Sequence, residues 1–136
     1  NRLRAAARPA PRGGTETILL VEDDAAVREL AREVLEQRGY RVLEASSGAE
    51  ALRAWPAVRD QVALVLTDLV MPDGVSGHEL AERLRAERAR LAVVFTSGYS
   101  AELAGRELAL PGGEAFLQKP FSSNTLLETV RRCLDG

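Results

Sequence analysis

The stretch VALVLTD, residues 62–68, consists of six uncharged residues and a final aspartate. Strands of a parallel sheet are covered by helices on both faces, so they read as nearly continuous apolar runs. Residues 62–67 therefore predict a central strand of a parallel sheet. Asp68 falls just beyond this strand, at the carboxyl edge where such sheets bind ligands.

Short apolar runs and amphipathic segments alternate on both sides of this strand. Within residues 25–38, Val27, Leu30 and Leu35 share one helical face and Arg28 lies on the opposite face. This alternation predicts an α/β fold, a doubly wound five-stranded parallel sheet with helices on both faces. The predicted strands are 18–21, 40–45, 62–67, 91–95 and 115–117, and the predicted helices are 25–38, 47–56, 76–89, 101–108 and 122–134.

Residues 1–16 differ in composition from the rest of the chain. They hold four arginines, and two prolines and two glycines between residues 9 and 14 break any helix. We expect a flexible basic linker or tail over 1–16 and one domain over 17–136.

The remaining composition excludes several classes of protein. The domain carries more acidic than basic residues, so we expect no nucleic-acid binding. No apolar run approaches the roughly 20 residues that span a bilayer, and no signal peptide is visible. The only cysteine, Cys133, excludes an internal disulfide and indicates a reducing, cytoplasmic location.

Chemically active side chains follow four of the five predicted strands. Glu22 and Asp23 follow the first, Asp68 the third, Ser97 the fourth and Lys119 the fifth. Crowded carboxylates stay ionised only with a compensating charge, and Mg²⁺ prefers oxygen ligands of this kind. An ionised aspartate beside Mg²⁺ is suited to phosphoryl transfer, in which it acts as the nucleophile.

Lys119 is the only lysine, and the other 17 basic residues are arginine. A phosphoryl oxygen near Asp68 needs a compact, mobile positive charge, which lysine supplies better than the rigid guanidinium fork. Pro120 stiffens the chain beside it, and whether their peptide bond is cis or trans is left open.

Four segments together resemble the receiver domain of two-component response regulators. They are ILLVEDD (18–24), LVLTDLVMPDGVSG (64–77), VVFTSGYS (93–100) and FLQKPF (116–121). The resemblance covers about residues 17–135. It implies the flavodoxin-like (βα)5 fold with strand order 2-1-3-4-5.

The resemblance also implies a role for each site residue. Asp68 resembles the phosphoacceptor and Lys119 the residue that contacts the phosphoryl group. Ser97 and Phe116 occupy the positions of the switch pair. The implied Mg²⁺ ligands are Asp68, Asp23, Glu22 through a water, and the backbone carbonyl of Val70.

The implied function is a signalling switch in a His-Asp phosphorelay rather than a conventional enzyme. The implied donor is a histidine kinase, in cis or in trans, or a histidine phosphotransfer protein. Phosphorylation would draw Ser97 toward the phosphoryl group and turn Phe116 inward. The face formed by 101–108, 115–117 and 122–134 would then change shape. Homodimerisation through that face is left open.

Some features favour particular members of the family. The loop after Asp68 and the segment FTSGYS (95–100) look most like receivers of hybrid histidine kinases. We therefore expect a C-terminal receiver of a hybrid kinase, with a single-domain regulator as the alternative.

Three other functions fit the sequence less well. A phosphatase of the haloacid dehalogenase type would place a second aspartate two residues after the nucleophile, where Val70 stands. A receiver-like module that is never phosphorylated would lack the acids or the lysine. A flavodoxin would need a phosphate-binding loop after the first strand, where acids would repel phosphate.

Overall fold

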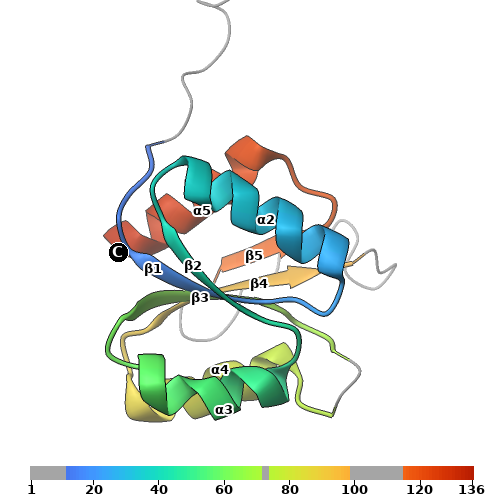
Figure 1. Ribbon diagram of the computed structural model, residues 1–136, viewed down its shortest axis with the longest axis vertical. Coiled ribbons are helices and arrows are strands. Elements are labelled where there is room, and N and C mark those ends of the chain that lie inside the picture. The colour runs from blue at the N-terminus through green and yellow to red at the C-terminus, as the bar shows by residue number, and fades with distance from the viewer. Residues whose placement is uncertain (1–11, 72–73, 99–114) are drawn as a thin grey trace, which may run out of the picture.

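The computed structural model describes residues 12–71, 74–98 and 115–136. Up to residue 97 its elements alternate strand and helix as the sequence pattern predicts (Figure 1). The expected helix over 101–108 lies outside the described residues. The elements are β1 (Thr17–Val21), α2 (Ala25–Gln37), β2 (Arg41–Ala45), α3 (Gly48–Val58), β3 (Val62–Asp68), α4 (Gly77–Glu87), β4 (Ala92–Ser97), β5 (Ala115–Gln118) and α5 (Ser123–Asp135).

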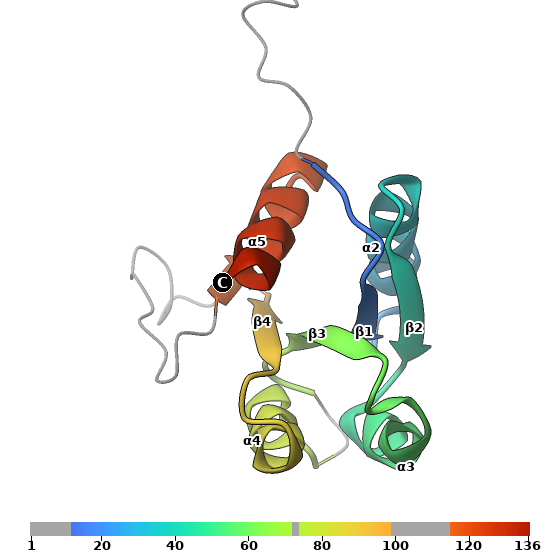
Figure 2. The same ribbon diagram turned by 90° about the vertical axis from the view of Figure 1, so that its left-hand side faces the viewer.

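The strands form one sheet in the order β2-β1-β3-β4-β5, and all neighbouring pairs are parallel. Helices α2 and α5 cover one face, and α3 and α4 cover the other (Figures 1 and 2). The predicted doubly wound, flavodoxin-like sheet is therefore confirmed.

The core consists of two apolar layers because successive side chains of a strand point to opposite faces. Ile18 and Leu20 of β1 pack with Leu35 of α2 and with α5, whereas Leu19 and Val21 pack with Trp55 of α3 and with α4. β3 divides its side chains in the same way, which explains why both central strands lack charged residues until their carboxyl ends.

Each helix begins at a polar N-cap. Asp24 accepts hydrogen bonds from the backbone N–H groups of Ala26 and Val27. Ser47 caps α3 by accepting a hydrogen bond from the N–H of Glu50 at 3.0 Å, but the reciprocal contact of a capping box, from the Ser47 N–H to the Glu50 carboxylate, is not formed. The carboxylate of Glu50 instead accepts from the hydroxyl and the backbone N–H of Ser46, one residue earlier.

The end of α3 was predicted wrongly. The helix does not stop at Pro56 but continues to Val58, and the N–H of Arg59 still reaches the carbonyl of Trp55 at 2.8 Å. A proline this close to the helix end removes one hydrogen bond without breaking the last turn. Within the described residues, no helix is long and apolar enough to span a membrane.

Residues 12–16 lie against the body of the domain. Arg131 of α5 donates to the carbonyl of Gly13 at 3.1 Å and forms an ion pair with Glu16 at 2.7 Å. Arg12 pairs with Asp135 at 2.9 Å. The predicted domain boundary between residues 16 and 17 stays a prediction, but the segment just before it is anchored to α5.

Candidate functional site at the carboxyl edge of the sheet

Parallel pairing brings the predicted site residues to one edge. The last pair between β1 and β3 joins Val21 to Thr67, so Glu22 follows β1 beside the position where Asp68 ends β3. Asp68 in turn pairs with Thr96 of β4. Residues far apart in sequence thus meet because all five strands end at this edge.

Three carboxylates lie together there. Oxygens of Glu22, Asp23 and Asp68 are all within 4.8 Å of one another. Glu22 and Asp68 are buried, whereas Asp23 is exposed. The cluster is therefore open to solvent at Asp23, which leaves a way in for a cation or a phosphoryl donor.

Lys119 supplies the positive charge of this cluster. Its Nζ lies 2.6 Å from Glu22 Oε1 and 3.2 Å from Asp68 Oδ2. Burial alone would lower the pKa of Lys119, but the hydrogen bond and charge of Glu22, aided by Asp68, outweigh it and raise that pKa. Lys119 is therefore a charged partner of both acids. The Lys119–Pro120 peptide bond, left open by the sequence, is cis.

Glu22 is held by its second oxygen as well. Its Oε2 accepts a hydrogen bond from the backbone N–H of Asp24 at 3.0 Å. Burial raises the pKa of Glu22, while Lys119 and the Asp24 N–H act in the opposite direction. Both oxygens of Glu22 thus have partners, which fix the orientation of its carboxylate.

The remaining predicted residues lie nearby but do not contact the acids through any hydrogen bond within the described part of the chain. Ser97 is buried at the end of β4, and its hydroxyl donates to the carbonyl of Gly98 at 3.1 Å. Phe116 is half-buried and packs against the cluster that contains Val93 and Phe95. The side chain of Val70 is 72% exposed, two residues beyond Asp68.

The sequence analysis missed Gly77, the first residue of α4. A Cβ atom built on Gly77 would lie 2.0 Å from the carbonyl oxygen of Asp68, and the N–H of Gly77 donates to Leu69 at 2.8 Å. Only glycine allows α4 to approach this closely. The signal was a glycine directly after the Ser76 cap, where glycine disfavours a helix and so needs a packing reason.

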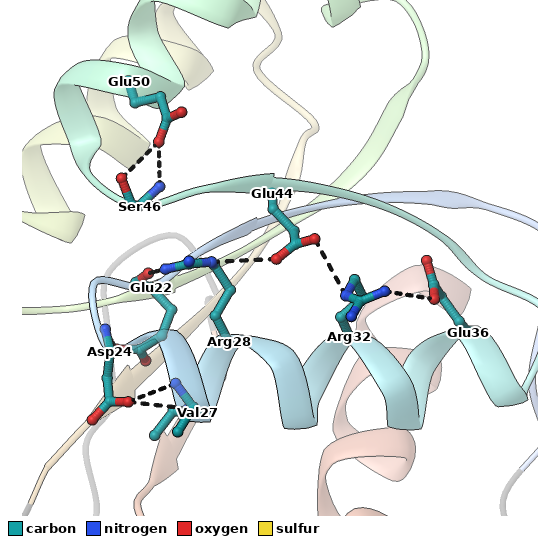
Figure 3. Close-up of polar contacts among 10 residues, drawn as sticks. Glu22, Asp24, Val27, Arg28, Arg32, Glu36, Glu44, Ser46 and Glu50 are labelled. Carbon is teal, nitrogen blue, oxygen red and sulfur yellow. Dashed lines mark hydrogen bonds and ion pairs between the residues drawn. The ribbon is translucent and has the colours of Figure 1, made fainter.

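The contact made by Arg28, which the sequence predicts on the polar face of its helix, was not foreseen either. Its side chain is only 21% exposed and donates from Nη1 to the backbone carbonyl of Glu22 at 2.7 Å (Figure 3). No local pattern marks this contact, since it depends on how α2 lies relative to the loop after β1.

Comparisons with known proteins agree with this geometry. The sequence model of the response regulator receiver domain family matches residues 18–131. The chain therefore belongs to the response regulator receiver domain family of two-component systems.

Among its relatives is the sensor kinase CckA of Brucella abortus (strain 2308). The two are 39% identical over 122 residues, which is 90% of this chain and 13% of CckA. The response regulator receiver protein CpdR of the same organism is 32% identical over 86% of this chain and 95% of CpdR. The chain spans only 27% of the transcriptional regulator DctD of Pseudomonas aeruginosa. Its similarity to the longer relatives is thus confined to part of each.

Solved structures show the same relationship. The receiver domain of the hybrid histidine kinase CckA is 37% identical, with a TM-score of 0.72 over 87% of this chain and 98% of that one. The response regulator TrrA of Thermotoga maritima, solved in complex with Mg²⁺ and BeF, is 28% identical, with the same TM-score and coverage.

Proposed function

We propose that this chain is a phosphoacceptor switch of a His-Asp phosphorelay and that Asp68 accepts the phosphoryl group. The observation that carries the proposal is the convergence of three carboxylates with a single lysine, whose Nζ lies 3.2 Å from Asp68. A carboxylate oxygen of Asp68 attacks the phosphorus atom of a phosphohistidine on the donor. The P–N bond breaks, and the imidazole leaves with the electron pair and is protonated.

The donor set suits Mg²⁺ because all three side chains offer hard oxygen ligands. Asp23 and Asp68 would hold the ion directly, Glu22 through a water, and the backbone carbonyl of Val70 would complete the protein ligands. When bound, Mg²⁺ would neutralise charge on the transferred phosphoryl oxygens. Lys119 would form an ion pair with another of these oxygens.

Ser97 and Phe116 are proposed as the switch residues. The Ser97 hydroxyl, which donates to Gly98, would rotate to donate to a phosphoryl oxygen. Phe116 is half-buried beside Phe95, so it could pack more deeply when Ser97 turns toward the phosphoryl group. The two arrangements would be existing states whose populations phosphorylation changes.

A protein donor is supported by the surface beside Lys119. A cavity of about 170 Å³ opens there between α2 and the start of α5, with Leu30, Val34 and Phe121 among its apolar lining. Leu30 is 63% exposed. An apolar surface beside Lys119 fits a protein donor, either a histidine kinase or a histidine phosphotransfer protein. Because such a kinase uses ATP, the phosphoryl transfer would take place in the cytoplasm.

The proposal is tested with beryllofluoride, which mimics a phosphoryl group on a carboxylate. Amide NMR spectra are recorded with Mg²⁺ before and after addition of beryllofluoride. We expect large shifts around Asp68, Ser97 and Phe116 in the wild type and none in Asp68→Asn. Unchanged wild-type spectra, or the same shifts in Asp68→Asn, would contradict it.

A further inference from the structure

The loop between β1 and α2 carries two of the three clustered carboxylates, Glu22 and Asp23, so its conformation determines the geometry of the cluster. Besides the contact of its Oε1 with Lys119, three hydrogen bonds hold Glu22 in this loop. Its N–H donates to Ala45 at 3.0 Å, its Oε2 accepts from Asp24 at 3.0 Å, and its carbonyl accepts from Arg28 at 2.7 Å. The last of these is the only one of the three made by a side chain of α2.

Arg28 is itself held in place from β2. Its Nε donates to Glu44 Oε1 at 3.2 Å (Figure 3). The other oxygen of Glu44 lies 3.2 Å from Arg32 Nε, in an ion pair without hydrogen-bond geometry. Arg28 and Arg32 thus share one carboxylate, but only Arg28 is seen to reach the loop.

The carbonyl that Arg28 holds belongs to the peptide group joining Glu22 to Asp23. This group is planar and includes the Asp23 Cα, so fixing its oxygen also restrains the position of that atom, from which the Asp23 side chain projects. Asp23 is exposed, so its carboxylate lacks the packing that immobilises Glu22. We propose that Arg28 is a positioning residue for the metal site, which orients Asp23 through the Glu22 carbonyl. This inference rests on the proposed function, because it concerns the same Mg²⁺ site.

The alternative is that Arg28 only joins α2 to β2 through Glu44. The two roles predict opposite changes in Mg²⁺ affinity when Arg28 is replaced by an uncharged residue. Removing a positive charge near a cation site strengthens cation binding by Coulomb's law. Removing a positioning contact weakens it, as mutations of groups that orient metal ligands commonly do by 10–100-fold.

The test compares Mg²⁺ affinity, measured by amide NMR titration, for Arg28→Gln, Arg28→Lys and Arg32→Gln. We expect binding about 10-fold weaker in Arg28→Gln and weaker in Arg28→Lys, which keeps the charge but not the two-pronged contact. Arg32→Gln removes the same charge one turn away, so we expect a change of less than about twofold. Unchanged or tighter binding in Arg28→Gln would overturn the inference.

A second measurement separates this inference from the proposed function. Amide hydrogen exchange of Asp23 and Asp24 in the metal-free protein should be faster in Arg28→Gln than in Arg32→Gln. If the wild type fails to bind Mg²⁺, the proposed metal site is wrong whatever Arg28 does. If the wild type binds Mg²⁺ and both variants exchange and bind alike, only the positioning role is wrong.

Discussion

Lys119 Nζ lies closer to Glu22 than to Asp68, at 2.6 Å against 3.2 Å. The sequence suggested that this lysine serves the phosphoacceptor, but it joins Asp68 at the end of β3 to Glu22 in the loop after β1. Its ammonium is the counter-charge that lets Glu22, which is only 3% exposed, remain next to Asp68. A bound cation would compete with Lys119 for the same carboxylates.

We expect Lys119→Met to lose about 3 kcal/mol of unfolding free energy without metal, because Glu22 and Asp68 are left buried without a counter-charge. Urea denaturation measures this loss. Mg²⁺ should stabilise the variant more than the wild type, because the ion takes over the role of the ammonium. Equal stability of the two proteins in the absence of metal would show that Lys119 is not the counter-charge.

Gly77→Ala should displace α4 from the end of β3. The added Cβ would meet the Asp68 carbonyl at 2.0 Å, so we expect a net loss of about 2 kcal/mol despite the better helix propensity of alanine. The beryllofluoride response at Asp68 should also weaken. Gly98→Ala is the control for stability, since no atom of the described residues lies within 4 Å of its added Cβ. A Gly77→Ala variant as stable as Gly98→Ala would refute the close approach.

Arg131→Ala should release the segment before β1. Arg131 holds the Gly13 carbonyl, so we expect trypsin to cut the Arg12–Gly13 bond several-fold faster in the folded variant. Mass spectrometry of the fragments measures this rate. Arg132→Ala is the control, because Arg132 is the exposed neighbour on the same helix. Equal cleavage in both variants would mean that the segment is not anchored by Arg131.

The Glu16–Arg131 ion pair should make the stability of the folded protein depend on pH. The hydrogen bond from Arg131 is the largest cause that holds the pKa of Glu16 below the usual glutamate value of about 4.5. A carboxyl with a lowered folded-state pKa stabilises the protein above its unfolded-state pKa, and this stability is lost as pH falls through the folded-state value. The advantage of the wild type over Glu16→Gln should therefore be present at pH 7 and shrink below about pH 4.5.

The expected size of this advantage is at most about 1 kcal/mol, because Glu16 is partly exposed. Thermal unfolding of both proteins between pH 3 and pH 7 measures it. A difference that stays constant over this range would show that the pair does not contribute through the charge of Glu16.

The sequence alone was sufficient for the five strands, the described helices and the edge at which the acids and the lysine gather. The elements follow from hydrophobic periodicity and from cap residues such as Asp24, which are local features of the sequence. The position of the site follows from topology, because the carboxyl ends of parallel strands lie at the same edge of the sheet. The predicted end of α3 at Pro56 was wrong, because a helix tolerates one missing hydrogen bond when its preceding turn is packed against the core.

Only the tertiary structure decided which groups at that edge contact one another. The preference of Lys119 for Glu22, the approach of Gly77 to Asp68 and the contact of Arg28 with the Glu22 carbonyl each join separate elements. Such contacts depend on where each helix lies on the sheet and on the direction of each side chain. Those directions are set by packing of the whole core rather than by the order of neighbouring residues.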